Sequence, residues 1–115
     1  MTVKPVHEDP EVTVFAWHFV REALDGTYRL VGYRVDSKRG RISSTISEFD
    51  MASRTVTTFS GRVYHLRGNQ DPVHAAHIVR RHAELCGLNE DAVALVDVEE
   101  VALAYAPWLP SDRFN

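Results

Sequence analysis

The chain has 115 residues, 44% of them hydrophobic, and a formal net charge of -3 at pH 7. A chain of this length suits one domain, whose core needs no disulfide for stability. A single cysteine, Cys86, excludes an internal disulfide, and no apolar run near the start resembles a signal peptide or a spanning helix. We therefore expect a cytoplasmic protein that does not contact a membrane.

The charges are divided along the chain. Residues 26–81 carry ten Lys or Arg and four acids, whereas residues 82–112 carry seven acids and no Lys or Arg. The molecule is electrically polarised if these segments lie on different faces, and the charges neutralise each other if the segments pack together. The sequence leaves both arrangements open.

The polar residues 1–11 contain two prolines and predict a flexible N-terminal arm. A single domain is expected to span residues 12–110, followed by a tail of residues 111–115. Residues 12–21 are β-branched and aromatic, with apolar side chains on both parities, which predicts a strand covered on both faces.

Two further strands are expected before residue 50. The turn Asp25-Gly26 leads into a strand over residues 27–36, in which Gly32 allows a bend or a bulge. A third strand, from about 41 to 49, has one polar face.

Residues 54–68 are the most informative stretch, because two β-rich runs flank Ser60-Gly61 like the arms of a hairpin. Mirroring the arms about this turn pairs Thr57 with Tyr64 and Thr55 with Leu66 on one face. The strands together predict a five-stranded antiparallel β-meander.

Asp71-Pro72 is a strong helix start, because an acidic N-cap precedes a proline at the first helical position. With Gly87 as a stop, we expect a helix over residues 72–86 that packs on the sheet. Its expected apolar stripe consists of Ala75, Ile78, Val79, His82, Ala83, Leu85 and Cys86.

The pattern of residues 92–96 fits either a strand or a helix. Asp97 to Glu100 resembles a capping box and predicts a shorter C-terminal helix to about Tyr105. The expected fold class is therefore α+β: a five-stranded meander packed by one amphipathic helix and this shorter one.

The histidines do not form a convincing metal site. His74 and His77 have the spacing of two ligands on one helix face, but that face lacks a third. His82 and Cys86 would need His65 or His18 from the sheet, and both are better explained as core residues. We expect no catalytic residue, metal or cofactor, and keep a small metal-dependent enzyme as the second alternative function.

A single-stranded nucleic-acid-binding sheet is the first alternative. Arginines alternate with tyrosines on the expected strands, and such sheets hold single strands by stacking and phosphate contacts. The negative net charge and the absence of an RNA-binding signature argue against this function.

Our leading hypothesis is a non-enzymatic protein-binding module. One amphipathic helix covers one sheet face, so a protein partner or a second copy in a homodimer would cover the other. The competing arrangement is that the C-terminal helix and Trp108 cover it within the monomer. The candidate binding residues on the sheet are Arg29, Arg34, Arg54, Arg62, Tyr64 and Arg67.

Residues 50–66 follow the pattern D-x-x-x-R-x-V-x-T-x-S-G-x-x-Y-x-L. This pattern resembles a group of small uncharacterised bacterial proteins of phage or mobile-element contexts. The resemblance implies a compact accessory or inhibitor protein rather than a metabolic enzyme, and it assigns no catalytic residue.

Overall fold

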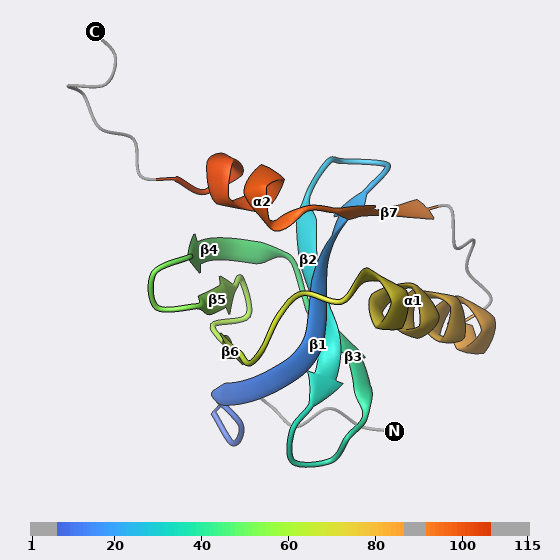
Figure 1. Cartoon of the computed structure of the whole chain (residues 1–115), viewed down its shortest axis with the longest axis horizontal. Helices are drawn as coiled ribbons and strands as arrows, with labels where there is room; N and C mark the ends of the chain where they lie inside the picture. Colours follow the sequence, from blue (N-terminus) through green and yellow to red (C-terminus); the bar gives the residue numbers. More distant parts are fainter. Residues whose placement is uncertain (1–6, 87–91, 107–115) are drawn as a thin grey trace, which may run out of the picture.

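The computed structural model describes residues 7–86 and 92–106. Within them the chain forms a mixed seven-stranded sheet and two helices (Figure 1). The α+β class is confirmed, and the purely antiparallel five-stranded meander is wrong. The strands are β1 (Glu11–Glu22), β2 (Tyr28–Arg34), β3 (Gly40–Ile42), β4 (Ile46–Asp50), β5 (Thr55–Thr58), β6 (Val63–Leu66) and β7 (Val93–Val96), and the helices are α1 (Pro72–Cys86) and α2 (Val98–Ala104).

The sheet curls around its long strand β1. The strand order is β3-β2-β1-β6-β5-β4, and only residues 43–45 separate β3 from β4 in the chain. The expected third strand is therefore broken into two strands that lie at opposite ends of the sheet order. β6 pairs in parallel with the first part of β1, because the chain reverses its direction an even number of times between these two strands.

β1 begins one residue earlier than the expected domain boundary, since Glu11 already pairs with Val63 of β6. The second part of β1 pairs antiparallel with β7, residues 93–96, which settles the ambiguous segment as a strand. No helix among the described residues is long and apolar enough to cross a membrane.

A β-bulge in β1 explains its apolar residues on both parities. Opposite β2 the register shifts between Phe15 and His18, and Ala16 has a φ of 48°. The extra residue reverses the direction of the side chains that follow, so Val14 before the bulge and Trp17 after it face the same core. Gly32 of β2 lies opposite this bulge, whereas the sequence predicted a bend or a bulge in the strand of Gly32 itself.

The chain covers both faces of this part of the sheet with its own elements. The core inside the curled sheet consists of Val12, Val14, Trp17, Phe19, Leu30, Ile46, Phe49, Val56, Tyr64, Leu66, Val96, Val98 and Val101. A second cluster lies under α1 and consists of Val20, Val31, Ala75 and Ile78. The alternative to a homodimer was that the C-terminal helix and Trp108 cover the second face within the monomer. Helix α2 does pack there, with Val98 and Val101 in the core. Trp108 lies outside the described residues.

Helix α1 has the bounds that the sequence predicts. The Asp71 carboxylate accepts the His74 backbone N–H at 3.0 Å and caps the first turn. The expected stripe is wrong in its second half, because His82 is exposed and Leu85 is 71% exposed. Buried contacts with the sheet come from Ala75 and Ile78, so the helix continues beyond the surface that it covers.

The hairpin at Ser60 has a different register from the expected one. Val56 pairs with Tyr64 and Thr57 with Val63, so the predicted pairing is wrong by one residue. The Thr58 N–H donates to the Arg62 carbonyl at 3.0 Å, which leaves a three-residue loop that ends at Gly61 with a φ of 92°. Such loops favour glycine at their last position. The one-residue slip places Tyr64 on the same face as Val56 rather than on the face of Thr57.

Helix α2 begins after Asp97, but the expected capping box does not form. Asp97 makes no side-chain cap hydrogen bond. Glu100 instead accepts hydrogen bonds from Arg21 at 2.7 Å and from the Tyr28 hydroxyl at 2.8 Å. The carboxylate thus joins α2 to β1 and β2 rather than closing its own first turn.

Candidate functional site

A cleft of about 630 Å³ lies between the β4–β5 hairpin and the C-terminal end of α2. We call it the β4 cleft. Its apolar walls include Phe49, Met51, Ala102 and Tyr105, and Glu48 and Asp50 supply carboxylates to its lining. The cleft therefore combines an apolar interior with negative charge.

The register of the sheet turns backbone polar groups toward this cleft. Hydrogen bonds at both ends of the β5–β6 pairing show that Val56 directs its N–H and C=O to β6. Phe49 is opposite Val56 in β4, so its own N–H and C=O point away from β5. Among the strands of the described residues, none pairs with this edge of β4.

Tyr105 holds α2 against the same edge. Its hydroxyl donates to the Ile46 carbonyl at 2.9 Å. Burial raises the pKa of Tyr105, so the hydroxyl keeps the proton that it donates. The far end of β4 is thus closed, and the segment around Phe49 is the open part.

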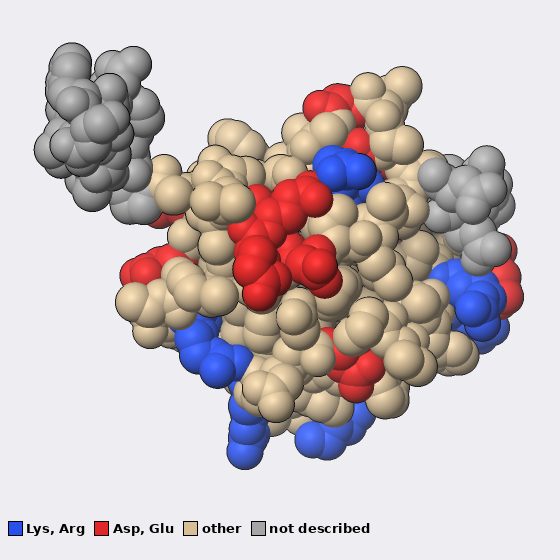
Figure 2. All heavy atoms as spheres, turned by 45° about the horizontal axis from the view of Figure 1, so that its top comes forward, with Lys and Arg blue, Asp and Glu red and all other residues tan. Residues whose placement is uncertain are grey.

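The Asp50 carboxylate at the cleft is charged near neutral pH. Hydrogen bonds from Ser53 lower the pKa of Asp50, and the Ala52 N–H donates to the same carboxylate at 3.0 Å. Glu48 is exposed. Figure 2 shows acidic atoms gathered near the middle of the face where α2 lies, while Lys and Arg atoms lie just above them and toward the lower and right-hand edges. The basic and acidic segments of the chain are not fully separated, because Arg81 of the first and Glu84 of the second form an ion pair at 3.7 Å.

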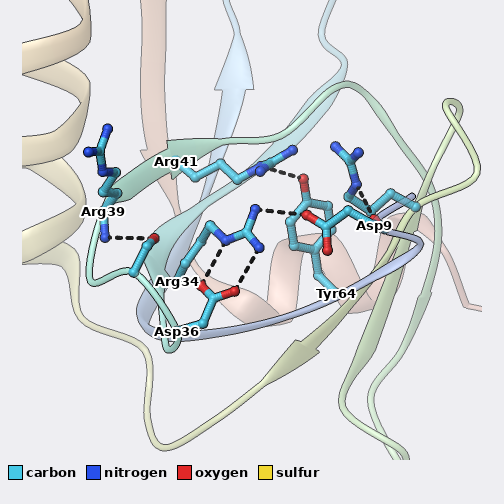
Figure 3. A network of polar contacts seen from close by, with 8 residues as sticks. Asp9, Arg34, Asp36, Arg39, Arg41 and Tyr64 are labelled. Atoms are coloured by element: carbon cyan, nitrogen blue, oxygen red, sulfur yellow. Dashed lines mark hydrogen bonds and ion pairs between the residues drawn. The ribbon is translucent and has the colours of Figure 1, made fainter. Parts of the chain in front are cut away.

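The predicted binding residue Arg34 lies in a polar cluster at another part of the sheet (Figure 3). Its guanidinium donates two hydrogen bonds to Asp36, at 3.0 and 2.9 Å, and one to Asp9 at 2.9 Å. Hydrogen bonds to Asp36, and then to Asp9, raise the pKa of Arg34 although partial burial opposes them. The same contact with Arg34 lowers the pKa of Asp36.

Two other predicted residues, Arg62 and Tyr64, belong to the same cluster. Arg62 is only 5% exposed, and its Nε donates to the Asp9 carbonyl at 2.9 Å. Tyr64 is 2% exposed, and its hydroxyl accepts a hydrogen bond from Arg41 at 3.0 Å. The cluster fastens the segment before β1 to β2 and to Arg62 just before β6, and it joins β3 to β6, so we assign it a structural role.

The remaining predicted residues lie apart from this cluster. Arg29 forms an ion pair with Glu22 at 2.8 Å. Arg54 donates to the Gly68 carbonyl and lies over the Trp17 ring, 5.9 Å from its centroid. Arg67 is exposed. The six candidates therefore do not form one binding surface.

Sequence reasoning missed the residues of the β4 cleft and the two carboxylates of the polar cluster, Asp9 and Asp36. Arg34 and Asp36 are two positions apart, but Asp36 lies in the turn after β2, so the alternation of side chains along a strand does not predict their contact. Asp9 carries no signal either, because its partners are 25 and 53 positions away.

The histidines are dispersed, and the described residues contain no group of three or more His, Cys, Asp or Glu that could hold a metal ion. His74 instead pairs with Asp71, at 2.7 Å, and His65 with Glu11, also at 2.7 Å. His82 is exposed. The imidazoles that we considered as ligands thus have separate surroundings.

His18 predicts a pH-dependent stability. It is 3% exposed on the α1 side of β1, and burial lowers its pKa from 6.5, although Asp97 and Asp71 oppose this shift. As the pH falls, the unfolded chain binds the proton before the folded protein does. The contribution of neutral His18 to stability is therefore complete above the unfolded pKa and is lost as the pH falls below it. Urea unfolding from about pH 7 to 5 should show a smaller loss of stability for His18→Leu than for the wild type.

The exposed His77 on α1 supplies the control for this prediction. His77→Leu should keep the wild-type loss of stability over the same pH range. Equal pH dependence in the wild type and His18→Leu would show that protonation of His18 does not oppose folding.

Comparison with known proteins adds no functional assignment to these sites. The cleft and the cluster are defined by the geometry of this chain alone. No protein-family model matches the chain, and no curated protein or solved structure shows significant similarity to it.

Proposed function

We propose that this protein is a non-enzymatic protein-binding module that takes an extended segment of a partner along the edge of β4. The observation that carries the proposal is the backbone of Phe49, whose N–H and C=O point toward a cleft of about 630 Å³. Extended peptides bind such edges by adding a strand: main-chain hydrogen bonds supply affinity, and pockets for alternate side chains supply specificity.

The lining of the cleft defines the chemistry of the partner. An apolar side chain of the partner fits against Phe49, Ala102 and Tyr105. Lysine or arginine on either side of it would lie near Glu48 and Asp50, where complementary charge favours encounter and register. The partner is therefore a basic and apolar extended segment, and its capture suits the accessory or inhibitor role that the resemblance of residues 50–66 implies.

Fluorescence polarisation with a labelled peptide of alternating valine and lysine tests this function. The peptide should bind the full chain more weakly as salt is added, because ion pairs near the rim are screened. Glu48→Lys should weaken binding about tenfold, since it places a like charge beside the peptide. Methylation of the peptide backbone nitrogens on one edge should abolish binding, because a strand added at β4 needs those N–H donors.

Glu84→Lys is the matched control. Glu84 is exposed on α1 and does not line the cleft, so this substitution makes the same change of charge away from the cleft. Its affinity for the peptide should equal that of the wild type. The proposal fails if a peptide with glutamate in place of lysine binds equally well, if both variants weaken binding equally, or if no binding occurs up to about 1 mM.

The single-stranded nucleic-acid alternative has less support in the geometry. Tyr64 and Arg62 are buried, so the tyrosine ring is not accessible for stacking on a base. Arg29 and Arg34 already form ion pairs with carboxylates. We therefore place protein binding first.

A further inference from the structure

A second cavity, of about 340 Å³, opens beside Trp17. We call it the Trp17 pocket. Phe49, Leu66 and Val98 form apolar walls, and Arg54 also lines it. It lies toward the first residue of α2, whereas the β4 cleft lies at the end of that helix. A pocket of this size with few polar groups is typical of small-molecule sites.

The bulge in β1 places the aromatic wall of this pocket. The extra residue at Ala16 turns Trp17 to the core side of the sheet. There the indole N–H donates to the Gly68 carbonyl at 3.2 Å, and the ring packs edge-on against Phe19 with centroids 5.7 Å apart. The indole is therefore held from two sides, and 5% of Trp17 stays exposed.

Arg54 gives the pocket a positive charge. The backbone of Arg54 has a φ of 58°, a conformation that costs energy in a residue other than glycine. The guanidinium donates to the neutral Gly68 carbonyl and lies over Trp17, and no carboxylate of the described residues forms an ion pair with it. Most of its five N–H donors are thus available to an anion.

Gln70 is a second and independent sign of a ligand. It lines the same pocket, and its side-chain Oε1 is buried without a hydrogen-bond donor. A buried acceptor without a hydrogen-bond donor destabilises the folded state. A donor group on a bound molecule would remove that cost.

We propose that the Trp17 pocket binds a small aromatic carboxylate that carries a hydrogen-bond donor on its ring. The ring lies against Trp17, Phe49 and Leu66, the carboxylate pairs with Arg54, and the donor reaches Gln70. This site does not depend on peptide binding in the β4 cleft, so the two proposals can fail separately.

Calorimetric titration of the full chain tests this site with three probes. Indoleacetate supplies the ring, the carboxylate and the indole N–H, while tryptophol lacks the carboxylate and N-methylindoleacetate lacks the N–H. Indoleacetate should bind about tenfold more tightly than tryptophol, because a charge-assisted pair with Arg54 is lost in the alcohol. It should also bind about fivefold more tightly than the N-methyl derivative, because Gln70 then keeps its unsatisfied acceptor.

Arg54→Asn tests the charge without disturbing the turn, since asparagine tolerates a positive φ. It should weaken indoleacetate binding about tenfold, whereas Arg67→Asn, an equal change of charge outside the pocket, should not. Equal affinities of the two variants, equal affinities of the three probes, or no heat of binding up to about 1 mM indoleacetate would overturn the assignment. The comparison of probes on the wild type decides the question if Arg54→Asn does not fold.

Discussion

Replacing Phe19 by alanine should lower the free energy of unfolding by about 3–5 kcal/mol. Phe19 is 0% exposed in β1, and its ring packs against Trp17 and Phe49 with centroid distances of 5.7 and 5.1 Å. Alanine removes the burial of the ring and leaves a cavity between β1 and β4. Urea unfolding followed by circular dichroism measures the change.

Leu24→Ala is the control for this substitution, because Leu24 is 98% exposed in the turn after β1. It should change stability by less than about 0.5 kcal/mol. A loss of less than about 1 kcal/mol in Phe19→Ala would mean that the core can collapse around the missing ring, contrary to close packing at this point.

The parts of the fold that depend on residues close together in the sequence could be predicted from it. Helix α1 has the expected bounds because Asp71 and Pro72 specify its start locally, and the cap is made within the first turn. How far the helix packs on the sheet depends on the width of the sheet surface. This is why Leu85, although on the expected stripe, is exposed.

The β5–β6 hairpin shows that one residue more or less in a loop is enough to make a predicted strand register wrong. Gly61 fits the end of a two-residue turn or of a three-residue loop, and the two choices differ by one residue. The loop has three residues, and this choice buries Tyr64 and Arg62 on the side of Val56. Two of the six candidate binding residues therefore became internal through a single turn.

The candidate sites depend on contacts that no local pattern contains. The β4 cleft exists because α2 packs beside a strand some fifty positions earlier, and Tyr105 bonds to the Ile46 carbonyl across 59 positions. The Trp17 pocket likewise joins β1 to residues near Arg54 and to the start of α2. Sequence patterns place such residues on strands and helices, but the curvature of the sheet and the packing of α2 decide which of them meet.

Gly32→Ala is expected to destabilise the protein by about 1–3 kcal/mol, because the bulge of β1 fills the space beside Gly32. A Cβ at this position would lie 3.2 Å from the Trp17 Cβ and 3.3 Å from the Phe15 carbonyl oxygen and the Trp17 Cα. These atoms belong to the strand itself or lie next to it, so they cannot move aside by a rotation of a side chain. Thermal and urea unfolding should both show the loss.

Gly40→Ala separates this strain from the general effect of replacing a glycine in a strand. A Cβ at Gly40 would lie 3.1 Å from Ile78 Cγ1, a side-chain atom of α1 that can shift with a change of rotamer. Gly40→Ala should therefore cost less than Gly32→Ala, although its nearest contact is the closer of the two. The opposite order would show that β1 can give way at the bulge, and the wall that Trp17 forms in its pocket would then be mobile rather than fixed.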